Sequence, residues 1–318
     1  MQINNYSIYI VMYHYVREAK KSKYKNLKVL EFNEFKKQVK YFKKNFNILD
    51  PEDFIKILSN KKLIKKPSIL LTFDDGYKDH YDYVFPFLKK EKIKGCFYPP
   101  ASIVKDKVIL DVNKIQFFLS VELNKKKIFF YINSFLKDKF NISLDKILEK
   151  NKKLIVKLKS RHDDDETILI KALLQKFLPV HQRKYIIDRL FKKIVTKNYN
   201  QFSSELYLNS SNIKEMIKAG MHFGSHGYNH EWWANLTKNK QEKEILNSIN
   251  FLYKLGVKKK DLSVCYPYGS FDKHSITLLK KYSIKFGLTT IQKKVDKKNI
   301  SKHLTLPRFD TNQFKTLY

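Results

Sequence analysis

The chain has 318 residues, 43% of them hydrophobic, so it is long enough to bury a sizeable core in one large domain or two small ones. Its formal net charge is +33, but only five of the 64 basic residues are Arg. Nucleic-acid sites usually depend on the bidentate contacts of Arg, so we discount DNA and RNA binding. We interpret the Lys excess as the residue usage of an AT-rich genome, with an anionic membrane surface or an anionic substrate as the alternative.

The cysteine content and the apolar segments bear on the compartment. Cys96 and Cys265 are far apart in apolar surroundings, which is typical of buried free thiols rather than of a disulfide framework. The first residues lack the basic start of a secretory signal, and no apolar run reaches 18 residues. We therefore expect a cytoplasmic protein, or one resting on the inner surface of the membrane.

Short apolar runs alternate with helical patterns in the first third of the chain. The runs predict buried strands at 8–16, 68–73 and 94–98. The patterns between and after them predict helices at 33–46, 52–58 and 83–90. Such an alternation is typical of parallel strands joined by helical crossovers.

Residues 111–200 interrupt this alternation with Lys-rich, mostly helical sequence. Apolar residues recur at helical spacing in 168–177 and again in 186–194, and Pro179 separates the two helices. The acidic run 163–166 is most simply a helix start, since carboxylates favour the positive end of a helix dipole; a metal role is the alternative. We expect a helical insertion of about 90 residues.

The alternation then resumes to the end of the chain. Gly220 is expected to cap a helix at 212–219. Further strands are predicted at 221–225, 262–266 and 286–289, and further helices at 237–256 and 275–282. The fold class we predict is α/β, a distorted (β/α) barrel of about seven parallel strands with its active site at the C-terminal rim. We expect 1–318 to form a single catalytic domain, interrupted by the insertion at about 111–200.

Two adjacent carboxylates close the run at 68–73. Side chains alternate faces along a strand, so Asp74 and Asp75 can share a site only where the strand ends and the chain turns. Gly76 supplies that turn, because it accepts backbone angles that other residues resist. The alternative is that the two carboxylates only cap the helix that follows.

Two histidines, His226 and His230, lie four residues apart. They would share one face if 227–229 turned helically, although such spacing also arises by chance. Two imidazoles and one carboxylate make a three-ligand zinc set with an open position for water. One Asp of the pair would complete this set and the other would remain as a base, which predicts a metal-dependent hydrolase.

At these residues the chain resembles carbohydrate esterase family 4, the polysaccharide deacetylases. The run TFDDG at 72–76 matches the first family motif, Ser225 with the two histidines matches the second, and YPYG at 266–269 matches part of the third. The resemblance covers about 8–100 and 205–310. Cys265 stands where the family usually has Arg, and neither the Asp-x-x-x-Trp motif nor the C-terminal Leu-x-His motif is present. The early sequence MYHYV at 12–16 instead resembles the poly-N-acetylglucosamine deacetylase branch, where the motifs are permuted.

The resemblance implies a role for each site residue. Asp75, His226 and His230 would bind Zn²⁺, with Co²⁺ or Ni²⁺ also compatible, and Asp74 would take a proton from water. The backbone N–H of Tyr268 would stabilise the oxyanion. His14 would protonate the leaving amine, with His303 as the competitor and a buried structural histidine as the simpler alternative for His14.

Two further residue assignments are less direct. Arg308 is the candidate to replace the missing Arg and orient Asp74. Trp232 and Trp233 follow the histidines and would pack in the core or line the substrate.

The predicted function is removal of N-acetyl groups from an amino sugar in a polysaccharide or its nucleotide- or lipid-linked precursor. A deformylase or O-deacetylase with the same site is the close alternative. A catalytically silent carbohydrate-binding relative and a membrane-surface adaptor that uses the Lys-rich insertion are the rivals from other classes.

Overall fold

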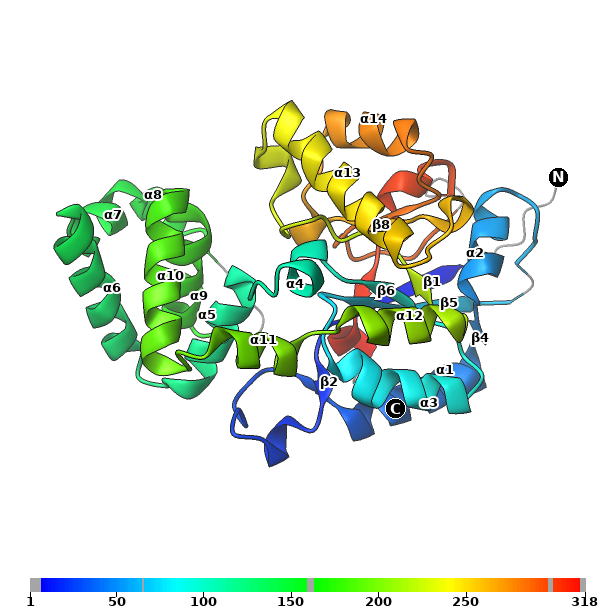
Figure 1. The fold of residues 1–318 in the computed structure, drawn as a ribbon, viewed down its shortest axis with the longest axis horizontal. Helices are drawn as coiled ribbons and strands as arrows, with labels where there is room; N and C mark the ends of the chain where they lie inside the picture. The colour runs from blue at the N-terminus through cyan, green and yellow to red at the C-terminus, as the bar shows by residue number, and fades with distance from the viewer. Residues whose placement is uncertain (1–6, 65, 159–162, 297–299, 315–318) are drawn as a thin grey trace. The chain divides into compact units, whose positions relative to one another are not determined.

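The computed structural model describes residues 7–64, 66–158, 163–296 and 300–314, which divide into two compact units (Figure 1). The first unit contains residues 1–18, 29–108 and 203–318, and the second contains 19–28 and 109–202. No helix in the described part of the chain is long and apolar enough to cross a membrane.

All strands of the described residues lie in the first unit. They are β1 (Ile8–Tyr13), β2 (Val16–Arg17), β3 (Leu30–Glu31), β4 (Asn47–Ile48), β5 (Ser68–Asp74), β6 (Cys96–Tyr98), β7 (His222–Phe223), β8 (Val264–Cys265), β9 (Gly287–Leu288) and β10 (Phe309–Asp310). Its helices are α1 (Phe32–Asn45), α2 (Pro51–Leu58), α3 (Phe85–Lys90), α4 (Ala101–Lys105), α12 (Ser210–Lys218), α13 (Lys238–Lys254) and α14 (Lys273–Lys281). A π-helix at His80–Val84 leads into α3.

The parallel sheet that the sequence predicts is confirmed. The main sheet has the order β10-β1-β5-β6-β7, with β4 also paired to β5, and β8 pairs with β9. Every pair of these strands is parallel, and single parallel bridges join Ser225 to Val264 and Leu288 to Leu306. Figure 1 shows this sheet in the middle of the first unit, with α13 and α14 drawn above it and α1, α3 and α12 below. All seven residues of β5 are buried, as expected for a parallel strand covered on both faces.

Local sequence explains the helices that cover the sheet. In α1, Phe35, Val39 and Phe42 recur at helical spacing and are fully buried. In α12, Asn209 forms a capping box with Asn212, and Gly220 follows the helix at φ +89°. The helix predicted at 237–256 is observed as α13, and Thr237 precedes it as the N-cap residue without a capping hydrogen bond from its side chain.

The second unit is built from helices, in agreement with the predicted character of this stretch. They are α5 (Asp111–Val121), α6 (Lys125–Phe140), α7 (Leu144–Lys150), α8 (Lys152–Ile155), α9 (Asp165–Ala172) and α10 (Val180–Ile194), and α11 (Tyr199–Leu206) continues into the first unit. The acidic run is confirmed as a helix start, since Asp164 caps α9 by accepting from the Thr167 N–H at 2.7 Å. Pro179 separates α10 from the preceding π-helical turn (Leu173–Phe177).

A row of aromatic side chains crosses the sheet one residue before the predicted site. Register pairs Tyr13 with Phe73, Phe73 with Phe97, and Phe97 with Phe223. Their rings stack in the same order, with centroids 4.9, 4.8 and 5.5 Å apart. This buried row crosses the sheet at one level, so the residues that follow it emerge together at the C-terminal ends of the strands.

Candidate active site

Asp75 lies in a tight turn directly after β5. Its φ is +68° and that of Gly76 is +63°, so two successive residues take left-handed backbone angles. A Cβ on Gly76 would lie 2.6 Å from the Cβ of Pro99, so a side chain would not fit there. The turn lets Asp74 and Asp75 reach the same end of the sheet. The hydroxyl of the buried Tyr77 donates to Asp75 Oδ2 at 2.6 Å, a contact that the sequence motif did not predict.

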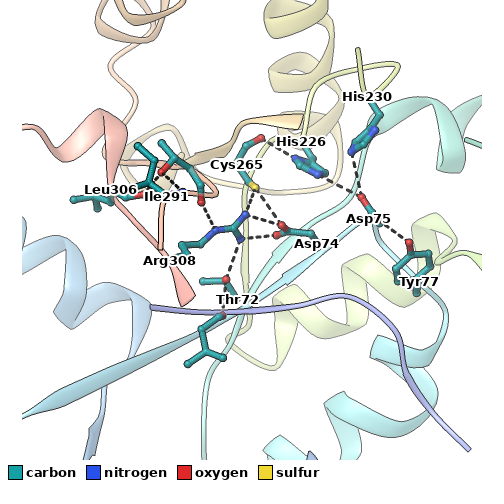
Figure 2. Close-up of polar contacts among 12 residues, drawn as sticks. Thr72, Asp74, Asp75, Tyr77, His226, His230, Cys265, Ile291, Leu306 and Arg308 are labelled. Carbon is teal, nitrogen blue, oxygen red and sulfur yellow. Dashed lines mark hydrogen bonds and ion pairs between the residues drawn. The ribbon is translucent and has the colours of Figure 1, made fainter. Parts of the chain in front are cut away.

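The two predicted histidines converge on Asp75 (Figure 2). His226 Nε2 lies 3.4 Å and His230 Nε2 3.3 Å from Asp75 Oδ1. The three ligand atoms lie within 4.8 Å of one another, and all three residues are buried. His226 Nδ1 donates to the carbonyl of Cys265 at 2.8 Å, which turns Nε2 toward Asp75. Asp75 Oδ1 has no hydrogen-bond partner among the described residues, so the donor set fits a divalent cation.

The pKa shifts of Asp75, His226 and His230 are also compatible with a bound cation. Burial acts to raise the pKa of Asp75, but the two histidine rings close to its Oδ1 outweigh burial and lower this pKa well below its usual range. Burial lowers the pKa of His230. Burial acts in the same direction on His226, but Cys265 and Asp75 raise its pKa well above its usual range. A cation would therefore take the place of a proton on His226.

Asp74 makes a two-pronged ion pair with Arg308, and both residues are almost completely buried. Arg308 Nη1 lies 2.9 Å from Asp74 Oδ1, and Nη2 lies 2.7 Å from Oδ2. Burial acts to raise the pKa of Asp74, but the charge and hydrogen bonds of Arg308 outweigh it and lower the pKa to about 2. Asp74 is therefore an anion at neutral pH, beside but outside the three-ligand group.

Arg308 is itself held by its neighbours. Its Nε donates to the Thr289 carbonyl at 2.9 Å, and Nη1 donates to Thr72 Oγ1 at 3.1 Å. Cys265 Sγ lies 3.0 Å from Nη2 and 3.4 Å from Asp74 Oδ2. Both cysteines are free and buried, as expected, and the small thiol of Cys265 leaves room for the Arg308 side chain.

His14 follows β1, next to the aromatic row. Its carbonyl accepts from the Nε2–H of the buried His80 at 2.8 Å, and its own side chain is partly exposed. His14 also interacts electrostatically with Asp74 and Asp75. The competing His303 lies elsewhere, in a cavity lined by Lys280 and Lys285 among others.

Tyr268 lies beside the histidine pair in a left-handed backbone conformation, with φ +56°. Its ring centroid is 4.5 Å from that of His230. On its other side it stacks on the half-buried Trp232, with centroids 4.3 Å apart and ring planes only 4° from parallel. Trp233 is fully buried against Tyr266, so the core interpretation is confirmed for Trp233, whereas Trp232 adjoins the site.

The segment that carries the histidines is not helical, so the conditional expectation for 227–229 is wrong. Gly227 has φ +74° and His230 has φ +59°. Glu244 of α13 contacts this loop: its carboxylate accepts from the backbone N–H groups of Tyr228 and Asn229. The signal for Glu244 in the sequence is an acidic residue on the apolar face of a helix.

Comparisons with known proteins agree with this geometry. The sequence pattern of the family described as polysaccharide deacetylase matches residues 61–117 and 184–287, about half of the chain. A stretch of 90 residues is 32% identical to the putative polysaccharide deacetylase YxkH of Bacillus subtilis (strain 168). This stretch is 28% of the chain and spans only 30% of the length of YxkH.

Two solved structures share the fold. The deacetylase PplD of Streptococcus pyogenes, solved with acetate, has a TM-score of 0.58 at 18% identity, over 96% of this chain and 92% of its own. IcaB of Ammonifex degensii has a TM-score of 0.57 at 15% identity, over 99% and 97%. From the family pattern and the motifs that carry the site, the chain belongs to the polysaccharide deacetylase family, carbohydrate esterase family 4.

Proposed function

We propose that this protein is a metal-dependent hydrolase that removes N-acetyl groups from an amino sugar. The observation that carries the proposal is the convergence of Asp75, His226 and His230 beside a second carboxylate, Asp74, which Arg308 keeps ionised. Membership of the polysaccharide deacetylase family supports the same reaction. A silent carbohydrate-binding relative would have no need of this complete and buried set.

The metal would be held by the three-ligand group, with Zn²⁺ as the first candidate and Co²⁺ or Ni²⁺ as alternatives. When bound, it supplies a Lewis acid that lowers the pKa of a water and polarises the acetamide carbonyl. Asp74 accepts the proton of the attacking water. Its low pKa makes it a weak base but guarantees that it is ionised.

The remaining residues act on the rest of the reaction. The backbone N–H of Tyr268 donates to the oxygen on which negative charge develops. His14 gives a proton to the leaving nitrogen, so that water and the amide become acetate and a free amine. The half-buried Trp232, stacked on Tyr268, offers a flat surface to a sugar ring.

The substrate we propose is an N-acetylated amino sugar of a polysaccharide, or of its nucleotide- or lipid-linked precursor. The strongly basic chain favours a substrate that carries phosphate, or an anionic membrane nearby. The early His14 favours the poly-N-acetylglucosamine deacetylase branch. We propose that 1–318 forms a single catalytic domain, a distorted barrel whose strand row is closed by the bridge between Leu288 and Leu306, and that the helical stretch at about 111–200 is inserted in it.

The test is acetate release from N-acetylated sugars, nucleotide sugars and oligosaccharides, by wild-type protein loaded with zinc and by Asp74→Asn. We expect release by the wild type and a loss of at least about 100-fold in the variant, because Asn cannot accept the proton. Zinc content, measured in parallel, should be unchanged, since Asp74 is not a ligand. Formate from N-formyl sugars, or acetate from O-acetyl esters only, would favour the deformylase or O-deacetylase instead. Zinc binding without release from any substrate would contradict the proposal.

A further inference from the structure

Helix α13 carries three polar side chains on its buried face, at positions i, i+3 and i+7: Gln241, Glu244 and Ser248. All three contact the segment that contains the metal-ligand candidates. Ser248 Oγ lies 2.5 Å from Ser225 Oγ, at the start of that segment. Gln241 Nε2 donates to the carbonyl of Trp233 at 2.8 Å, at its end. Between these two anchors, Glu244 contacts the loop itself.

The Glu244 carboxylate accepts hydrogen bonds from three N–H groups of the loop. Oε2 lies 2.9 Å from the backbone nitrogens of both Tyr228 and Asn229. Oε1 lies 2.7 Å from the Asn229 side-chain nitrogen and 3.2 Å from its backbone nitrogen. Successive backbone N–H groups that follow a left-handed residue form a concave site for an anion, and here the anion is a side chain.

The loop is also held from its opposite side. The backbone N–H groups of Ala101 and Ser102, at the start of α4, donate to the carbonyls of Gly227 and Tyr228 at 3.2 and 2.9 Å. The Gly227 N–H donates to Ser225 Oγ at 3.1 Å. The polar backbone groups between the two histidines are therefore used on both sides, and Glu244 is the charged member of this arrangement.

Such restraint matters because the loop ends on a strained residue. His230 has φ +59°, an angle that costs a residue with a Cβ about 1–2 kcal/mol and persists only where the surroundings fix it. Its Nδ1 has no hydrogen-bond partner among the described residues, so its ring is not oriented in the way that Cys265 orients His226. The position of the His230 ring therefore depends on the loop backbone and on the Tyr268 ring beside it.

From these contacts we propose that Glu244 is a positioning residue for the metal site: it fixes the loop between His226 and His230 so that both Nε2 atoms face Asp75, and thereby sets the affinity for zinc. This inference rests on the proposed metal site. Glu244 touches neither metal nor substrate and acts only through the backbone of the loop.

The test is a competition titration of the metal-free full-length protein with Zn²⁺ against a chromogenic chelator. We expect Glu244→Gln to weaken zinc binding by about 10-fold or more, which is typical for residues that support metal ligands. Gln keeps the shape of the side chain but turns an NH₂ group toward the donors of the loop. Glu242→Gln is the matched control, because Glu242 lies on the same helix and contacts Lys281 and Tyr282 instead. Zinc affinity within twofold of the wild type in Glu244→Gln would overturn the inference.

A second measurement separates positioning from general destabilisation. With Co²⁺ bound, the visible absorption bands report the geometry of the ligands in the folded protein only. We expect these bands to change in Glu244→Gln and not in Glu242→Gln. Identical bands in all three proteins would contradict the proposed role.

If Glu244→Gln does not fold, Asn229→Ala tests the inference instead. This substitution removes the side-chain nitrogen of the exposed Asn229, which donates to Glu244 Oε1 at 2.7 Å. A loss of zinc affinity of about threefold is expected for this variant, and none would overturn the inference. The test needs no substrate. Wild-type protein that binds zinc but deacetylates nothing would contradict the proposed function alone, whereas wild-type protein that binds no zinc would overturn both.

Discussion

The ion pair between Asp74 and Arg308 makes a sharp prediction about a single residue. Arg308→Ala should lower turnover at least 100-fold and destabilise the protein by about 3–5 kcal/mol, because it leaves a buried carboxylate without its cation. Acetate release and urea unfolding measure the two effects. The turnover and the stability of Arg308→Lys should lie between those of the wild type and Arg308→Ala, since Lys keeps the charge but not the two-pronged geometry. Full turnover in Arg308→Ala would show that the pair has no part in catalysis.

His222 predicts how stability depends on pH. Burial lowers its pKa to about 4, and its Nε2 lies 2.7 Å from Ser263 Oγ. The unfolded chain should titrate near pH 6.5, so below that pH it binds the proton that the folded protein excludes. The stabilisation is complete above about pH 6.5 and declines as the pH falls toward 4.

The size of this effect is measurable by urea unfolding at pH 7.5 and pH 5. His222 should account for a loss of about 2 kcal/mol in the free energy of unfolding between these values. His222→Gln keeps a polar partner for Ser263 but cannot titrate, so its own loss should be smaller by that amount. An equal loss in both proteins would refute the assignment. His80, whose pKa burial also lowers to about 4, should contribute a similar effect that remains in the variant.

At the scale of the elements, the turn after β5 should be intolerant of any side chain. Gly76→Ala meets both a left-handed φ and the Cβ of Pro99 at 2.6 Å, whereas Gly256→Ala meets a positive φ with nothing within 4 Å. Gly256→Ala should cost about 1–2 kcal/mol, and Gly76→Ala at least about 1 kcal/mol more because of the steric clash. Zinc affinity should fall only in Gly76→Ala, since that turn carries Asp75. Equal costs in urea unfolding would contradict the steric argument.

Some helices and strands could be predicted from the sequence more completely than others. Each predicted strand overlaps an observed one, because a parallel strand covered on both faces must be a continuous apolar run, and β5 is the clearest case. The short strands β3, β4 and β10 escaped prediction, because each pairs one apolar residue with Glu, Asn or Asp and so gives no apolar run. The ligand loop was expected to be helical if its histidines were to meet, because spacing alone does not reveal a backbone shaped by Glu244 from another element.

The residues of the candidate site also differ in how far the sequence predicts them. The adjacent carboxylates and the histidine pair are local signals, so the convergence of Asp75 with His226 and His230 could be anticipated. Arg308 could be proposed only because the resemblance left a gap at Cys265. Tyr77 and Glu244 act through contacts that depend on tertiary structure. Nothing in the immediate sequence marks Tyr77, and the only sign of Glu244 is an acidic residue on the apolar face of a helix.

For the whole molecule, zinc should stabilise the first unit, which holds all three ligands. Both tryptophans, Trp232 and Trp233, also lie in this unit, so tryptophan fluorescence follows its unfolding selectively. Zinc at 100 times its dissociation constant should raise the free energy of unfolding by about 2.7 kcal/mol. Asp75→Asn should abolish this increase. If zinc does not shift the midpoint of unfolding of the wild type, measured by tryptophan fluorescence, the proposed ligand set is contradicted.

The distance along the chain between Asp74 and Arg308 has a consequence for biosynthesis. The two residues are 234 positions apart, and Arg308 immediately precedes β10, the last strand in the described part of the chain. At roughly 5–20 residues per second, a ribosome needs about 10–50 s after Asp74 to make Arg308. Throughout that time the carboxylate lacks its cation and β1 lacks one of its neighbours. We therefore expect the nascent chain to be inactive until Arg308 has been made, and a chain that terminates before Arg308 to release no acetate.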